Sequence, residues 1–142
     1  MNEKKIVLVT GATGAQGGSV AKALLANGEF AVRILTRNAT SPKALALQAA
    51  GAGIAEGNLD DIDSLLAAMK DCYAVFGVTN FWEHFENEFA QGKNLIDAVQ
   101  QSNIAHFVFH TLPDYHRLSH GQYSVPHCDL KATLEQYARS LQ

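Results

Sequence analysis

The stretch Val7–Gly18, VLVTGATGAQGG, decides the fold, because it joins an apolar run to the start of a helix through three glycines. A continuous apolar run of this kind is typical of a strand buried on both faces of a parallel sheet. Gly11 permits a tight turn, Gly14 lets the backbone approach a ligand without an intervening Cβ, and Gly17 lets the helix pack closely on the sheet. That helix, expected from Gln16 to Asn27, directs its unpaired N–H groups and its positive dipole end at the loop. The stretch therefore predicts a cradle for the pyrophosphate of a dinucleotide.

Every residue of this loop is a candidate cofactor-binding residue. The loop consists of Gly11, Ala12, Thr13, Gly14, Ala15, Gln16 and Gly17. Its Gly-x-x-Gly-x-x-Gly spacing has one residue more in the first gap than the usual dinucleotide fingerprint. The spacing resembles the variant found in short-chain dehydrogenases/reductases.

Length and composition indicate a single domain over residues 1–142. The chain is 47% hydrophobic and 18% charged, with a net charge of −3. Its lysines and arginines are scattered, so the charge pattern gives no indication of direct nucleic-acid binding. From the N-terminal residues we expect no signal peptide, and the sequence contains no apolar stretch long enough to span a membrane. We therefore expect a cytoplasmic or nuclear protein, in which Cys72 and Cys128 serve as small packing residues.

Strand-like and helix-like segments alternate along the whole chain, as in α/β proteins. The predicted strands are Ile6–Val9, Ala31–Thr36, Gly53–Glu56, Tyr73–Val78 and Ala105–His110. After the first helix, further helices are predicted from the Ser41-Pro42 pair, after a cap at Asp61 or Asp63, over Glu83–Ser102, and from Pro126 towards Gln142. The assigned starts rest on a capping side chain or on a proline in the first turn.

Five parallel strands with right-handed crossovers predict a doubly wound Rossmann sheet in the order 3-2-1-4-5. The ligand crevice then opens beside strands 1 and 4. Strand 5 becomes an edge, and its apolar segment Phe107–Phe109 is a poor edge because unpaired backbone groups there invite another chain. We expect a protein partner, a missing segment of chain or a second copy in a homo-oligomer to cover it.

The residues after strand 2 bear on the choice of dinucleotide. NAD-binding proteins usually place an Asp or Glu there to accept from the ribose hydroxyls. This chain has Arg37, followed by Asn38, with Lys43 nearby. A guanidinium can hold a 2′-phosphate through two hydrogen bonds, which favours NADP(H) over NAD(H). The alternative is that Arg37 is a solvated residue at a strand end.

The ends of strands 3 and 4 supply further candidates for cofactor contact. Asn58 and Leu59 follow strand 3, where the adenine end of the cofactor would lie, although they also suit a simple helix start. Val78, Thr79 and Asn80 end strand 4 at the crevice, where their backbone groups would line the nicotinamide ribose.

The glycine loop and four later segments resemble the NmrA-like family of atypical short-chain dehydrogenases/reductases. The later segments are Thr36–Asn38, Gly57–Asp61, Val78–Glu83 and His127-x-x-x-Lys131. The resemblance implies NADP binding in a Rossmann domain without evident dehydrogenase activity, and a redox-sensing role through contacts with transcription factors or other proteins. It also includes NADPH-dependent reductases. By position, Lys93 and Lys131 match family lysines that approach the cofactor.

Length is the main departure from the family. The resemblance implies members about twice as long, with a C-terminal substrate domain that we expect to be absent from this chain. A natural short form, a truncated gene and a fragment all remain open. We expect most of a substrate pocket to be missing.

The candidate catalytic residues depart from the short-chain dehydrogenase pattern. A short-chain dehydrogenase uses a tyrosine four residues before its lysine and a serine on the preceding strand end. Here Thr111, His127 and Lys131 occupy those positions, and Tyr123 lies before Pro126, ahead of the helix. His127 and Lys131 share a helix face, so together they could move a proton. In the alternative, His127 is a packing residue and Lys131 binds the cofactor ribose.

Two functions follow from these residues. The first is a non-catalytic NADP(H)-binding regulator that acts through a protein partner such as a transcription factor. The second is an NADPH-dependent oxidoreductase that reduces a small carbonyl or a specialised metabolite. We expect no metal site, because His116 and His120 have ligand spacing but lack a third ligand.

Overall fold

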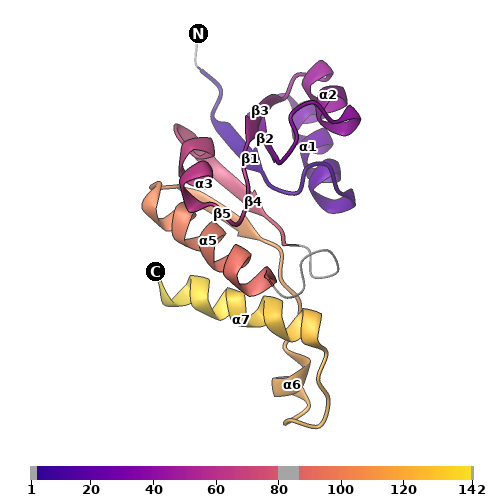
Figure 1. Ribbon diagram of the computed structural model, residues 1–142, viewed down its shortest axis with the longest axis vertical. Coiled ribbons are helices and arrows are strands. Elements are labelled where there is room, and N and C mark those ends of the chain that lie inside the picture. The colour runs from indigo at the N-terminus through magenta and orange to yellow at the C-terminus, as the bar shows by residue number, and fades with distance from the viewer. Residues whose placement is uncertain (1–2, 80–86, 142) are drawn as a thin grey trace.

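A parallel five-stranded sheet forms the centre of the computed structural model, which describes residues 3–79 and 87–141 (Figure 1). The strands are β1 (Ile6–Val9), β2 (Ala31–Thr36), β3 (Gly53–Glu56), β4 (Cys72–Gly77) and β5 (His106–Phe109). Their order in the sheet is β3-β2-β1-β4-β5, and each neighbouring pair is parallel. The predicted doubly wound topology is confirmed.

Helices cover both faces of the sheet, and each face has its own apolar core. The helices are α1 (Ala15–Asn27), α2 (Pro42–Ala49), α3 (Ile62–Ala68), α5 (Glu88–Gln101), α6 (Tyr115–Leu118) and α7 (Pro126–Ser140). Val9 and Ile34 lie in the core beneath α1 and α2. Leu8 and Leu35, their neighbours on the same strands, face α3 and α5 instead. Successive strand residues point to opposite faces, which explains why these strands are apolar throughout.

Local sequence signals define several helix ends as expected. Ser41 caps α2 by accepting from the Ala44 N–H, and Pro42 is the first helical residue. Of the two candidate caps for α3, Asp61 is the cap, because its side chain accepts from the N–H groups of Asp63 and Ser64. The predicted start of the long helix at Glu83 lies outside the described residues.

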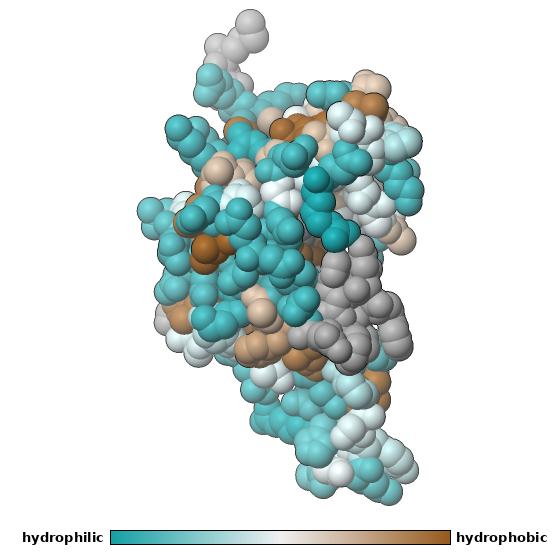
Figure 2. Space-filling model, viewed as in Figure 1, coloured by the Kyte–Doolittle hydropathy of each residue, from teal (hydrophilic) through white to brown (hydrophobic). Residues whose placement is uncertain are grey.

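Helix α7 packs against α5, and α6 projects beyond it at the end of the molecule opposite the N-terminus (Figure 1). The visible surface is mainly hydrophilic, with apolar residues in small groups (Figure 2). Within residues 3–79 and 87–141, no helix is long and apolar enough to cross a membrane.

Strand β5 lies at the sheet edge, as predicted, and pairs with β4 alone in the sheet. Val108 on this strand is 46% exposed. It lines a surface hollow together with Val20 of α1 and Phe76 of β4. An exposed apolar edge is a template for pairing with another chain.

We expect Val108→Lys to reduce concentration-dependent self-association, because a charged side chain on an edge strand disfavours strand addition. Its effect on the free energy of unfolding should be within about 0.5 kcal/mol, as for other surface substitutions. Leu45→Lys is the matched control, since Leu45 is also 46% exposed but lies on a helix. Sedimentation velocity over a concentration series measures both variants. Equal effects of the two substitutions would show that the edge strand has no special role in association.

Candidate dinucleotide-binding site

The glycine loop between β1 and α1 is built around close backbone contacts. Gly11 has φ +60°, and a Cβ there would lie 2.8 Å from Cγ1 of Val78. The Gly14 N–H donates to the Gly11 carbonyl at 2.9 Å, which closes the turn. Both the left-handed backbone and the close approach of Val78 therefore require glycine at position 11.

Gly17 imposes the strongest steric requirement in the loop. A Cβ at this position would lie 2.3 Å from the carbonyl oxygen of Gly11 and 2.6 Å from that of Thr10. The first turn of α1 can therefore pack directly on the end of β1. Its N-cap, Gly14, provides no side-chain hydrogen bond, and the first turn contains no acidic residue. The positive end of the helix dipole is thus available to an anion, as a dinucleotide pyrophosphate requires.

A cleft of about 520 Å³ opens at this loop and runs past the ends of β2, β3 and β4. Most of the predicted cofactor-binding residues line it: Gly11, Thr13, Gly14, Ala15, Gln16, Gly17, Arg37, Asn38, Asn58, Leu59, Val78 and Thr79. Ala12 instead packs in the core under α1, and Asn80 lies outside the described residues. Lining residues that the sequence reasoning missed are Thr10, Leu35, Thr36, Ser41, Gly57 and Gln91.

Thr10 ties the two strands that border the cleft. Its Oγ1 accepts from the Val78 N–H at 2.9 Å, and the residue is fully buried. This side-chain hydrogen bond joins the two chain segments just after the last paired residues of β1 and β4. It also holds Val78 against the glycine loop. The sequence signal for this contact is a polar residue directly after an apolar strand.

A capped turn follows β2 on the side of the cleft that carries Arg37. Thr36 Oγ1 accepts from the Asn38 N–H at 3.2 Å, and Asn38 Oδ1 accepts from the Thr40 N–H at 3.0 Å. Among the described residues that line the cleft, none is Asp or Glu. The carboxylate of Glu56, on β3, accepts from the Ala39 N–H of this turn at 3.2 Å, and Glu56 is not part of the lining.

Lys131 of α7 is buried beneath the end of β4. Its Nζ donates to the Thr79 carbonyl at 2.7 Å, to Thr79 Oγ1 at 3.0 Å and to Glu88 Oε1 at 2.7 Å. Thr79 Oγ1 in turn donates to Glu88 Oε1 at 2.6 Å. Lys131 is 5% exposed and Glu88 0%. These bonds use all three ammonium donors and join α7, α5 and the cleft wall; the sequence reasoning found Lys131 but missed Glu88.

The other residues considered for catalysis or cofactor contact do not line the cleft. Lys93 lies on the exposed side of α5 and pairs with Asp97 at 3.1 Å. His127 is half-buried one turn before Lys131 on α7. Thr111 lies beyond the end of β5, in the hollow that also contains Val108. Tyr123 is 62% exposed and precedes α7, as the position of Pro126 predicts.

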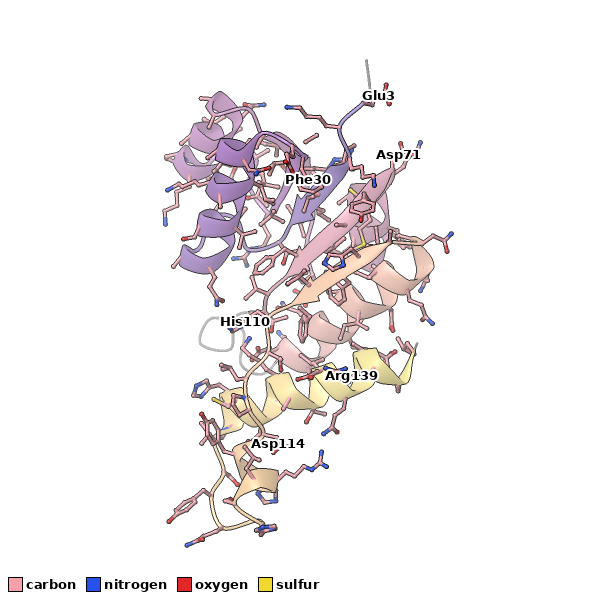
Figure 3. The ribbon with its side chains drawn as sticks, turned by 180° about the vertical axis from the view of Figure 1, so that it is seen from behind. Glu3, Phe30, Asp71, His110, Asp114 and Arg139 are labelled. Carbon is pink, nitrogen blue, oxygen red and sulfur yellow. The ribbon has the colours of Figure 1, made fainter. Side chains whose placement is uncertain are left out.

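His110 lies directly after β5, at the edge of the same hollow (Figure 3). Burial lowers the pKa of its imidazole, and the positive charge of Lys131 lowers it further. His110 Nδ1 has no hydrogen-bond partner within the described parts of the chain. Both effects disfavour the charged imidazolium form of His110, a residue that sequence reasoning did not single out.

Comparisons with known proteins agree with this geometry. A model of the NmrA-like family matches residues 3–142. The chain is 37% identical to the NmrA-like family domain-containing oxidoreductase lnaB of Aspergillus flavus, over 98% of this chain and 43% of that protein. The fold is similar to crystal structures of NmrA, a negative transcriptional regulator, with NAD (28% identity, TM-score 0.85) and with NADP (28% identity, TM-score 0.84). Each match covers 99% of this chain and 43% of the NmrA chain, so the chain spans less than half the length of these relatives.

We expect Lys131→Met to lower the free energy of unfolding by about 3–5 kcal/mol, because it leaves the Glu88 carboxylate buried without its cation. The double variant Lys131→Met/Glu88→Leu should recover most of that loss, since both charges are then removed. Lys93→Met, which breaks the exposed pair with Asp97, should lower the free energy of unfolding far less, because solvent screens an exposed ion pair. Urea unfolding measures all three. A Lys131→Met effect no larger than that of Lys93→Met would contradict a structural role for the buried pair.

Proposed function

The chain belongs to the NmrA-like family, and on that premise we propose that its cleft binds a nicotinamide dinucleotide. The observation that carries the proposal is the cradle at Gly17, where a Cβ would collide with the Gly11 carbonyl. That close packing presents the N-terminus of α1 to the cleft, where it would hold the pyrophosphate. Solved structures of NmrA with NAD and with NADP support the assignment. The bound cofactor would supply hydride chemistry, and the chain would supply binding and orientation.

We further propose that the cleft prefers NADP(H). Arg37 lines it after β2, where a guanidinium can bind a 2′-phosphate through two hydrogen bonds. Asn38 lines it beside Arg37 and is fixed by its own turn. The described lining has no carboxylate, the group that would accept from a free 2′-hydroxyl and repel a phosphate.

We expect Arg37→Ala to weaken NADP(H) binding about tenfold or more, because a charge-assisted contact is lost, while NAD(H) binding changes little. Arg37→Asp should reverse the preference towards NAD(H), since a carboxylate suits the free ribose hydroxyls. Arg139→Ala is the control, because it removes the same charge from α7 at a distance from the cleft. Calorimetric titration with all four dinucleotides measures the affinities. An equal loss for NADP and NAD in Arg37→Ala would contradict a role in the choice between them.

For the biological role, we propose a non-catalytic NADP(H)-responsive regulator in the cytoplasm or nucleus that acts through a protein partner such as a transcription factor. The state of Lys131 supports this reading, because all its ammonium donors are used within the fold and the side chain is 5% exposed. His127 stands where a short-chain dehydrogenase would have its tyrosine. NmrA, a negative transcriptional regulator, is one relative that supports such a role.

Thr79 offers a physical route from the cleft to helix α7. It lines the cleft and also receives two hydrogen bonds from Lys131 of α7. A ligand that orders this end of β4 would therefore also affect α7. Regulation requires only that the partner has different affinities for the two states.

We expect saturating NADP to slow amide hydrogen exchange in α7 more than in α3, because α7 is tied to the cleft wall through Lys131. Helix α3 does not line the cleft and serves as the internal comparison. Exchange measured by mass spectrometry with and without NADP gives both values. An unchanged α7 in a chain that binds NADP would exclude signalling along this route.

An NADPH-dependent reductase is the second candidate, favoured by relatives named as oxidoreductases and by Thr111 near the hollow beyond β5. In that case Lys131 would act as the acid and Thr111 would position a small carbonyl or a specialised metabolite. The reductase hypothesis predicts steady NADPH oxidation, and Thr111→Val should reduce its rate without changing the free energy of unfolding. A broad substrate panel monitored at the nicotinamide absorbance tests it, and absence of turnover by a chain that binds NADPH would favour the regulator.

A further inference from the structure

Gln91 of α5 is a buried residue of the cleft wall, and one of its polar atoms is itself buried without a hydrogen-bond partner among the described residues. It lines the cleft and is 2% exposed. Its Nε2 donates to Asp60 Oδ1 at 3.1 Å, whereas its Oε1 has no hydrogen-bond partner within the described parts of the chain. Leaving a buried acceptor unsatisfied costs about 1–3 kcal/mol, so such groups in folded proteins call for an explanation. A ligand that donates to Oε1 would supply one.

The orientation of the Gln91 amide follows from its neighbour. An ionised carboxylate only accepts hydrogen bonds, so Asp60 requires the NH₂ group of the amide to face it. The Oε1 atom is therefore directed away from Asp60. Helix α5 is held to the same loop a second time, because Asn94 Nδ2 donates to the Leu59 carbonyl at 2.9 Å. These two contacts fix the acceptor relative to the loop after β3.

The position along the cleft identifies the part of the ligand that meets Gln91. The glycine loop marks the pyrophosphate, and Arg37 marks the ribose on the side of β2 and β3. Gln91 is tied through Asp60 to the loop after β3, where Leu59 offers an apolar surface to a base. On this half of a dinucleotide, phosphate oxygens only accept. The ribose hydroxyls lie towards Arg37, which leaves the exocyclic amine of the base as the donor for Gln91.

We propose that Gln91 Oε1 accepts a hydrogen bond from the 6-amino group of adenine and so selects an adenine dinucleotide over one with a 6-oxo base. This inference rests on the proposed dinucleotide binding and adds a specificity residue to it.

The probe is nicotinamide hypoxanthine dinucleotide phosphate, which differs from NADP in having an oxygen in place of the 6-amino group and a proton on N1 of the base. In the wild-type chain, this oxygen would face Gln91 Oε1, so that one hydrogen bond is lost and two acceptors meet. We expect NADP to bind about tenfold more tightly than the hypoxanthine analogue. This ratio of dissociation constants, measured by calorimetric titration, tests the proposal without any substitution.

Gln91→Met then removes the acceptor at nearly constant volume, and the preference for NADP over the analogue should fall to about one. Asn94→Leu is the matched control: it removes an amide from the same helix that contacts the same loop, but Asn94 does not line the cleft. This control should keep the wild-type preference, even if its overall affinity falls. Thermal unfolding of each variant shows whether the fold is retained.

The outcomes separate this inference from the function on which it rests. NADP binding without discrimination by the wild-type chain would overturn the role of Gln91 and leave dinucleotide binding intact. A folded Gln91→Met chain that keeps the tenfold preference would also overturn it. If the wild-type chain binds neither dinucleotide, both proposals fail together. A wild-type preference that Gln91→Met removes and Asn94→Leu retains would establish Gln91 as the residue that recognises the amine.

Discussion

The close packing of α1 against the end of β1 is the contact on which the site depends. Gly17 lies so near the Gly11 carbonyl that any side chain would move the helix away from the loop. The same contact directs the N-terminus of α1 into the cleft, where its N–H groups and dipole favour an anion. One steric constraint thus explains both why the strand and helix meet closely and why the cleft suits a phosphate-bearing ligand.

The opposite wall of the cleft is held by a buried polar cluster. Lys131 and Glu88 pair at 2.7 Å, and both contact Thr79 at the end of β4. A buried ion pair contributes little net stability, but breaking it leaves an uncompensated buried charge. The pair therefore disfavours any packing of α7 that would separate Lys131 from Glu88. Because Thr79 also lines the cleft, the cluster links the site to α7. The same lysine is the residue that a catalytic reading would need as its acid.

The two halves of the cleft contribute different kinds of information about function. The glycine loop is general to dinucleotide binding and favours neither NAD nor NADP. Arg37 and Gln91 also line the cleft, and in our proposals they would meet the parts of a dinucleotide that differ among cofactors: the 2′-position and the base. The hollow beyond β5, which Thr111 and His110 line, carries the reductase proposal instead. The proposals on cofactor choice therefore rest on residues of the cleft, whereas the reductase proposal rests on residues of the hollow.

The sequence by itself determined the parallel sheet, its order, the glycine cradle and most of the cleft lining, because these depend on local periodicity, on glycine sterics and on the handedness of crossovers. Only the tertiary structure decided which polar residues of α5 belong to the site. Gln91 faces the cleft while Lys93, two residues later, faces solvent, since residues two apart lie on different sides of a helix. The family pattern favoured Lys93 for the cofactor, and no local signal paired Glu88 with Lys131. Contacts between residues 43 positions apart depend on how the helices pack, which neither propensity nor spacing specifies.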